Sequence, residues 1–106
     1  MNTYNPDLWV ILEMYEKSSG TVKKVFSGWY GGYLGSDSWK LSSGIVKVNE
    51  DDHAYEFINV SGSIYRCRKI AYGMSGLMCD VYENWQEKLK DNKDGWIRVV
   101  DEHYQK

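Results

Sequence analysis

Cysteine and long apolar runs are both scarce in this chain of 106 residues. The longest apolar run is Leu8–Leu12, far below the ~20 residues that a transmembrane helix needs, so we expect no membrane association. The two cysteines, Cys67 and Cys79, are too few for a disulfide framework. Because the first residues are polar and contain no signal peptide, we expect both cysteines to be free thiols in a reducing cytoplasm.

An excess of charge of either sign is lacking as well. The chain carries 13 basic and 15 acidic residues, which gives a formal net charge of −2. A protein that binds duplex nucleic acid normally has a basic excess, so we expect no partner of that class. The proportions of apolar residues (42%) and charged residues (26%) are those of a folded protein, and the length fits a single domain over residues 1–106.

The common catalytic and metal-binding motifs are absent too. The sequence contains neither the Gly-x-Ser-x-Gly motif of a serine nucleophile nor a glycine-rich loop that opens a helix and holds phosphates. The candidate metal ligands Cys67, Cys79, His53 and His103 lack the close spacing of a structural zinc site. We therefore expect no catalytic residues, no metal and no cofactor, and a protein that is not an enzyme.

Aromatic residues, by contrast, are abundant and make up 15% of the chain. Three of them, Trp29, Tyr30 and Tyr33, are interleaved with glycines in a segment without a clear period. A large ring covers much area at a small entropic cost, so aromatic side chains are common in binding sites. One hypothesis is that these three residues and Trp39 contact a partner. The other is a twisted strand with glycine kinks whose rings pack in the core.

The pattern of apolar residues predicts strands along most of the chain. Residues 8–15 alternate, and their first half is apolar on both sides, which is typical of a strand covered on both faces. A turn at residues 17–20 joins this strand to the next and predicts an antiparallel hairpin. The expected strands cover residues 8–15, 21–26, 39–48 with a bulge or bend at 42–44, 53–60, 63–70 and 96–100.

One helix is expected, from Ser75 to about Lys90. Ser75 is a suitable N-cap, and apolar residues recur after it at helical spacing. They make one face, which includes Val81, Tyr82 and Trp85. The order of elements predicts an α+β fold, in which this C-terminal helix packs on a strongly curved, partly barrel-like antiparallel sheet of about six strands.

A pair of arginines provides a second candidate site. With a two-residue turn around Gly62, one face of the two flanking strands carries Tyr55, Phe57, Arg66 and Arg68. An arginine beside an aromatic ring can bind a phosphate and stack on a base, which would make this face a site for a small molecule or nucleotide. Alternatively, the long arginine side chains only cover the rings at the edge of the sheet.

The stretch from Trp39 to about Met78 contains several short motifs in one order. They are Trp39-Lys40-Leu41-Ser42-Ser43-Gly44-Ile45, an acidic turn, Tyr55-x-Phe57, Ser61-Gly62-Ser63-x-Tyr65-x-Cys67-x-Lys69 and Tyr72-Gly73-x-Ser75. This series resembles small uncharacterised accessory proteins of large tailed bacteriophages. The resemblance implies an accessory or counter-defence factor that binds a host protein in the cytoplasm of the host cell. We therefore expect a non-enzymatic binding protein, with binding of a small molecule or nucleotide as the alternative.

Overall fold

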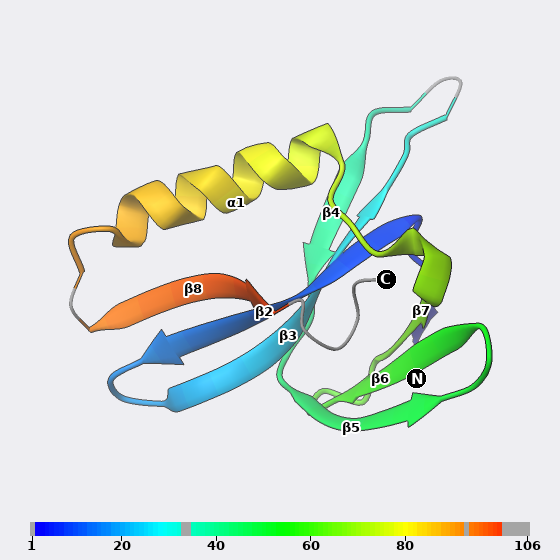
Figure 1. The fold of residues 1–106 in the computed structure, drawn as a ribbon, viewed down its shortest axis with the longest axis horizontal. Helices are drawn as coiled ribbons and strands as arrows, with labels where there is room; N and C mark the ends of the chain where they lie inside the picture. Colours follow the sequence, from blue (N-terminus) through cyan, green and yellow to red (C-terminus); the bar gives the residue numbers. More distant parts are fainter. Residues whose placement is uncertain (1, 33–34, 93, 101–106) are drawn as a thin grey trace.

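The computed structural model describes residues 2–32, 35–92 and 94–100. Within these residues the chain forms eight strands, one α-helix and the short 3₁₀ helix η1 (Figure 1). The elements are β1 (Thr3–Tyr4), β2 (Leu8–Glu16), β3 (Gly20–Trp29), β4 (Ser38–Leu41), β5 (Ile45–Glu50), β6 (Ala54–Asn59), β7 (Ile64–Arg68), η1 (Lys69–Ala71), α1 (Gly76–Leu89) and β8 (Gly95–Val100). The predicted α+β fold, mostly strands with one α-helix, is confirmed.

β2 lies at the centre of the first sheet, whose strand order is β4-β3-β2-β8. Both of its neighbours run antiparallel to it, and the predicted hairpin of β2 and β3 forms. As its sequence predicts, β2 is covered on both faces. Trp9 and Ile11 belong to a core cluster shared with the second sheet, whereas Val10 and Leu12 belong to a cluster shared with α1.

The second sheet has the strand order β1-β7-β6-β5 and packs against one face of the first sheet. β1, which lies where no strand was expected, runs parallel to β7, and the other pairs are antiparallel. Trp9 is completely buried between the sheets, and its indole N–H donates a hydrogen bond to the carbonyl oxygen of Arg68 at 2.7 Å. This side chain therefore joins the two sheets through both its ring and its hydrogen bond.

α1 covers part of the other face of the first sheet (Figure 1). It begins where predicted, because the side-chain oxygen of Ser75 accepts a hydrogen bond from the N–H of Met78 at 3.2 Å. Met78 is fully buried in the cluster beneath the helix. Val81, Tyr82 and Trp85 are partly buried against the same cluster, so the predicted apolar face of the helix is confirmed.

The strands form two separate sheets rather than one partly closed sheet. The strand expected over residues 39–48 is divided at residues 42–44, where the chain leaves the first sheet and enters the second. Ser42 donates its N–H to the carbonyl oxygen of Val25 at 2.9 Å, and the N–H of Val25 donates to the hydroxyl of Ser42 at 2.8 Å. Because a side chain completes this pair, the ladder ends at Ser42 and the backbone can turn away.

Candidate functional site

The arginines and rings of the second candidate site lie on opposite faces of the second sheet. Tyr55 and Phe57 point into the core and are buried. Arg66 pairs in register with Glu56, on the alternate face of β6, and Arg68 shares the face of Arg66. The shared face expected from the sequence is therefore wrong, and these residues do not form a combined aromatic and cationic site.

The turn between β6 and β7 explains this difference. The N–H of Asn59 donates to the carbonyl oxygen of Ser63 at 3.0 Å, which leaves residues 60–62 as a three-residue loop. The N–H of Gly62 donates to the carbonyl oxygen of Asn59 at 2.8 Å, and Gly62 has a φ of 91°. This is a type I turn followed by a glycine in the left-handed region. A loop one residue longer than expected shifts the pairing and moves every side chain of one strand to the other face.

Both arginines are held by contacts on the outside of the sheet. Arg66 forms ion pairs with Asp51 at 2.9 Å and with Glu56 at 3.4 Å. Arg68 donates a hydrogen bond from Nη2 to the carbonyl oxygen of Asp7 at 3.4 Å. The two guanidinium groups therefore stabilise the sheet and its connections rather than facing an aromatic pocket.

The aromatic residues of the first candidate site do not form one surface. Trp29 is half-buried and packs against the core between the two sheets. Its indole N–H donates to the carbonyl oxygen of Asn5 at 3.1 Å, and its ring meets that of Tyr4 edge to face at 6.3 Å. Tyr33 lies outside the described residues. The structure thus places Trp29 in the second of the two predicted environments, against the core.

Tyr30 is exposed over 57% of its surface, at the start of the connection between β3 and β4. The described parts of this connection project away from the rest of the molecule (Figure 1). The N–H of Tyr30 donates to the carboxylate of Asp7 at 2.8 Å, and the N–H of Gly31 donates to that of Asp37 at 3.0 Å. Two carboxylates therefore hold the backbone at the base of this connection, and the ring of Tyr30 is exposed to solvent.

Trp39 lies on the opposite face of the first sheet from Trp29, next to α1. It pairs with Gly28, whereas Trp29 pairs with the preceding residue of β4. Its ring meets those of Phe26 at 5.9 Å and Trp85 at 5.4 Å. We call Phe26, Trp39 and Trp85 the aromatic cluster. Trp39 remains 41% exposed, so the cluster presents one large ring to solvent.

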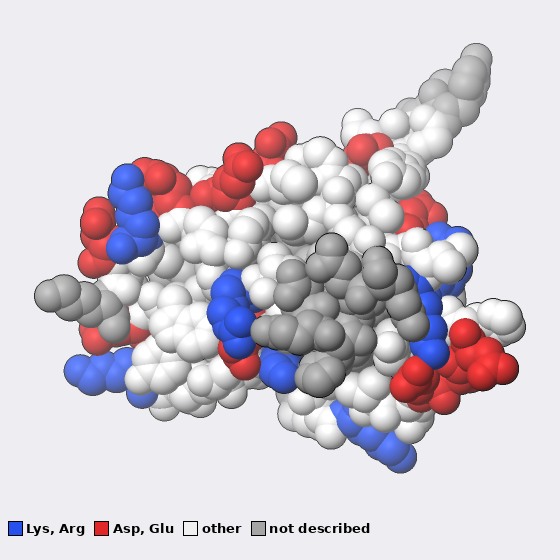
Figure 2. Space-filling model, viewed as in Figure 1, with Lys and Arg blue, Asp and Glu red and all other residues white. Residues whose placement is uncertain are grey.

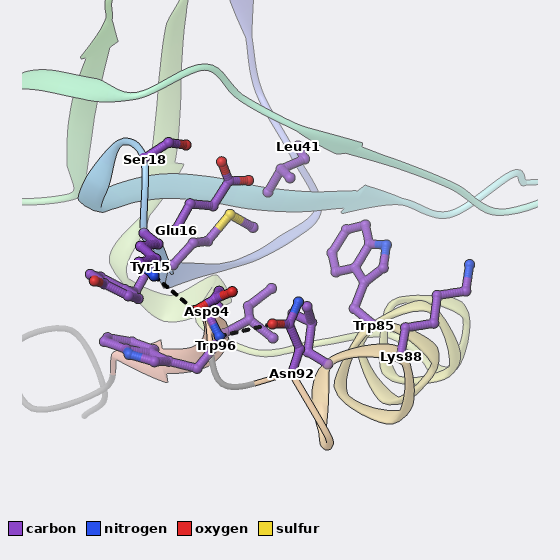
Figure 3. Close-up of a pocket in the computed structure, with 14 residues that line it drawn as sticks. Tyr15, Glu16, Ser18, Leu41, Trp85, Lys88, Asn92, Asp94 and Trp96 are labelled. Carbon is purple, nitrogen blue, oxygen red and sulfur yellow. Dashed lines mark hydrogen bonds and ion pairs between the residues drawn. The ribbon is translucent and has the colours of Figure 1, made fainter.

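A hollow of about 690 Å³ opens beside the aromatic cluster, between α1 and the end of the β2–β3 hairpin (Figure 3). The apolar side chains that line it are Met14, Leu41, Trp85, Leu89 and Ile97. In Figure 3, Leu41 projects from β4 and Trp85 projects from α1. Glu16 and Lys88, both exposed, add charged groups to its lining.

The hollow exists because one helix is narrower than the sheet beneath it. Four strands at their usual spacing span about 14 Å, whereas a helix with its side chains is about 10 Å wide. The side-chain amide of Gln86 donates to the carbonyl oxygen of Ile97 at 2.7 Å, which holds α1 over the β8 side of the sheet. Leu41 on β4 is therefore left beside the helix rather than under it. The sequence pattern placed Trp85 and Leu89 on the buried face of the helix and did not predict the hollow. The signal that could have predicted it is the expectation of a single helix on a sheet of several strands.

β4 is an edge strand, and within the described part of the chain no strand pairs with its outer side. The bond from the N–H of Ser42 to Val25 identifies these two residues as a hydrogen-bonded pair. Bonded and non-bonded pairs alternate along an antiparallel ladder, so the backbone groups of Trp39 and Leu41 point away from β3. The same two residues turn their side chains toward the aromatic cluster and the hollow.

The described thiol and imidazole side chains form no candidate metal site. Cys67 and Cys79 are free, as predicted, and burial raises the pKa of the Cys67 thiol, which disfavours the reactive thiolate. Among the described residues, which do not include His103, no three His, Cys, Asp or Glu side chains are arranged to hold a metal ion. No helix in the described ranges is both long enough and apolar enough to cross a membrane.

Comparison with protein families, with curated proteins and with solved structures finds no match to this chain. A functional assignment therefore depends on the geometry of its own residues. The feature that combines exposed aromatic surface, a cavity and the outward-pointing backbone groups of an edge strand is the side of the first sheet where β4 lies next to α1.

Proposed function

We propose that the protein acts by binding another protein rather than by catalysis, and that it does so at β4. The observation that carries this proposal is the juxtaposition of three features: the exposed ring of Trp39, the apolar hollow and the outer edge of β4. Each suits a protein partner. Exposed tryptophans are frequent anchors of interfaces, and an open strand edge offers a row of backbone hydrogen bonds.

The geometry favours a partner segment in extended conformation. Such a segment would form hydrogen bonds with the outward backbone groups of Trp39 and Leu41, as an added strand does. Its alternate side chains would point to the α1 side of the sheet, and an apolar one would enter the hollow. Acidic side chains lie along the outer side of α1 (Figure 2), so they border the site without occupying its apolar part.

The resemblance of residues 39–78 to phage accessory proteins suggests the source of the partner. We propose a protein of the bacterial host, bound in the host cytoplasm, and a role in disabling a host function such as defence. The contact surface on this chain is the same whatever the identity of that protein.

The test immobilises the purified chain and its Trp39→Ala variant and asks which host proteins each of them retains. The partner is identified by mass spectrometry, and its affinity for each variant is then measured by calorimetry. Loss of an interface anchor costs about 2 kcal/mol or more, so we expect Trp39→Ala to raise Kd about thirtyfold or more. Ile70→Ala is the control, because Ile70 is 89% exposed on η1 and should leave Kd unchanged. A partner bound equally by Trp39→Ala, or retention of a nucleotide instead of a protein, contradicts the proposal.

Two variants of Leu41 test whether the partner pairs with the strand edge. Leu41→Ala removes the side chain from the hollow, and Leu41→Pro also removes the N–H that points away from β3. If the partner adds a strand, Leu41→Pro binds it at least several-fold more weakly than Leu41→Ala does. Equal affinities of two folded variants would exclude pairing at this edge.

A further inference from the structure

A second, polar cavity of about 600 Å³ lies where the two sheets meet, on the other side of β4 from the hollow. It is open to solvent and is bordered by β1, by β4 and its crossover to β5, by the turn between β6 and β7, and by β7. The residues that line it are Asn2, Tyr4, Lys40, Leu41, Ser42, Ser43, Ser61, Gly62, Ser63 and Tyr65. No carboxylate is among these described residues, so the only formal charge in the lining is that of Lys40.

Three serines of this cavity form a chain of hydroxyl groups. Ser43 donates to Ser61 at 2.9 Å, and the hydroxyls of Ser61 and Ser63 lie 3.1 Å apart. The side-chain amide of Asn59 donates to the hydroxyl of Ser63 at 3.3 Å, so it fixes the end of the chain. Three hydroxyl hydrogens serve two hydrogen bonds, which leaves one hydrogen, on Ser61 or Ser63, for an acceptor outside the chain.

Tyr65 supplies a second unused donor. Its side chain is completely buried, yet its hydroxyl has no hydrogen-bond partner among the described residues. Burial raises the pKa of Tyr65 to about 12, so the hydroxyl keeps its proton at neutral pH. A buried polar group without a partner is costly, and native proteins rarely leave one unsatisfied. Because Tyr65 lines the cavity, a molecule within the cavity can supply the missing acceptor.

Lys40 supplies positive charge to the same cavity. Its ammonium lies 5.3 Å from the centre of the Tyr4 ring, and it forms no ion pair with any residue that the structure describes. The ring of Tyr4 in turn lies 4.8 Å from that of Tyr65, so a cation–π contact places the ammonium near the buried tyrosine.

We propose that this cavity binds a small oxyanion, namely a phosphate group. The unprotonated oxygens of a phosphate group are acceptors that carry negative charge, and the cavity offers the complement: a phenol hydrogen, a serine hydrogen and an ammonium. Hydrogen bonds to a charged acceptor are the stronger kind, and they would satisfy Tyr65. The site shares Leu41 with the hollow but does not use the aromatic cluster, so it is independent of the proposed partner-binding site.

The test is titration of the full chain with inorganic phosphate by calorimetry, at constant ionic strength set with chloride. We expect binding to the unmodified chain, and a Kd raised about tenfold or more by Tyr65→Phe and by Lys40→Met, because each loses one charge-assisted contact. Tyr65→Phe removes only the unsatisfied hydroxyl, so it should fold as well as the unmodified chain. Lys47→Met, on the exposed strand β5, should bind phosphate normally.

Two further measurements are needed. One distinguishes a phosphate ester from the free ion, and the other distinguishes this cavity from the proposed partner-binding site. Titration with phosphoserine distinguishes a phosphate ester from the free ion: tighter binding than inorganic phosphate indicates an ester, and weaker binding indicates the ion. Trp39→Ala should keep its phosphate affinity, whatever its effect on a protein partner. The proposal is overturned if neither ligand binds the unmodified chain, or if Tyr65→Phe binds phosphate with unchanged affinity.

Discussion

Asp51 holds the turn between β5 and β6 through three hydrogen bonds. One carboxylate oxygen accepts from the N–H groups of His53 at 2.8 Å and Ala54 at 2.9 Å, and the other accepts from Arg66 at 2.9 Å. The backbone N–H of His53 and the guanidinium of Arg66 lower the pKa of Asp51 from its ordinary 3.8 to about 2. All of these donors favour the charged carboxylate in the folded state.

This lowered pKa predicts a specific loss of stability in acid. A carboxyl group whose pKa is lower in the folded state stabilises the fold above its unfolded pKa, and that contribution disappears as the pH falls from about 4 to about 2. We therefore expect the melting temperature of Asp51→Asn to fall less steeply over this range than that of the unmodified chain. Asp52→Asn, which removes another carboxylate from the same turn, is the matched control. The prediction would be contradicted if the melting temperatures of the unmodified chain and of Asp51→Asn fell by the same amount between about pH 4 and about pH 2.

The contact between β3 and α1 shows how one small residue determines the distance between two elements. Gly28 faces the helix, and a Cβ atom built there would lie 3.0 Å from Cγ of Met78 and closer still to its sulfur. Met78 is fully buried at the start of α1. The first turn of the helix can approach the sheet this closely only because residue 28 has no side chain.

A double-mutant cycle tests this contact. We expect Gly28→Ala to destabilise the fold by about 1–3 kcal/mol through overpacking, and Met78→Ala by about 2–5 kcal/mol through a cavity. Because the added methyl group enters the space that Met78 leaves, the double variant should be more stable than the two losses predict by at least ~0.5 kcal/mol. Gly76→Ala, with open space around it, is the control. Additive losses in chemical denaturation would show that the two residues do not compete for space.

The sequence predicted elements well and their pairing less well. The helix boundaries followed from Ser75 and the apolar stripe, both of which are local signals. The register of β6 and β7 depended on whether the turn around Gly62 has two residues or three, and both fit the same residues. That single residue decided whether Arg66 faced the rings of Tyr55 and Phe57 or stood on the outer side. The candidate arginine site failed for this reason and not for lack of suitable side chains.

At the scale of the whole molecule, the first sheet has two unequal faces. One face is sealed by the second sheet, where Trp9 meets the rings of Phe57 at 5.6 Å and Tyr72 at 5.0 Å. The other is covered by a single helix and keeps the hollow beside Leu41. The α+β class followed from the order of elements, but the division into two sheets did not. It depends on the hydroxyl of Ser42, which ends one ladder, and no periodicity in the sequence distinguishes that from a bulge.

The sealed face predicts that the two sheets unfold together. Trp9 belongs to β2 of the first sheet, yet its ring packs on β6 and its indole N–H bonds to the last residue of β7. We expect the slowest-exchanging amides of β2 and β6 to have the same opening free energy in hydrogen exchange, since neither sheet can open without exposing Trp9. Trp9→Phe should lower both values equally, by about 2–3 kcal/mol, because it leaves a cavity and removes the hydrogen bond from the indole to the carbonyl oxygen of Arg68. Trp96→Phe, on the exposed side of β8, should change neither value. If Trp9→Phe lowers the value for β6 alone, the second sheet is a separate unfolding unit, and its contact with the first does not make the fold cooperative.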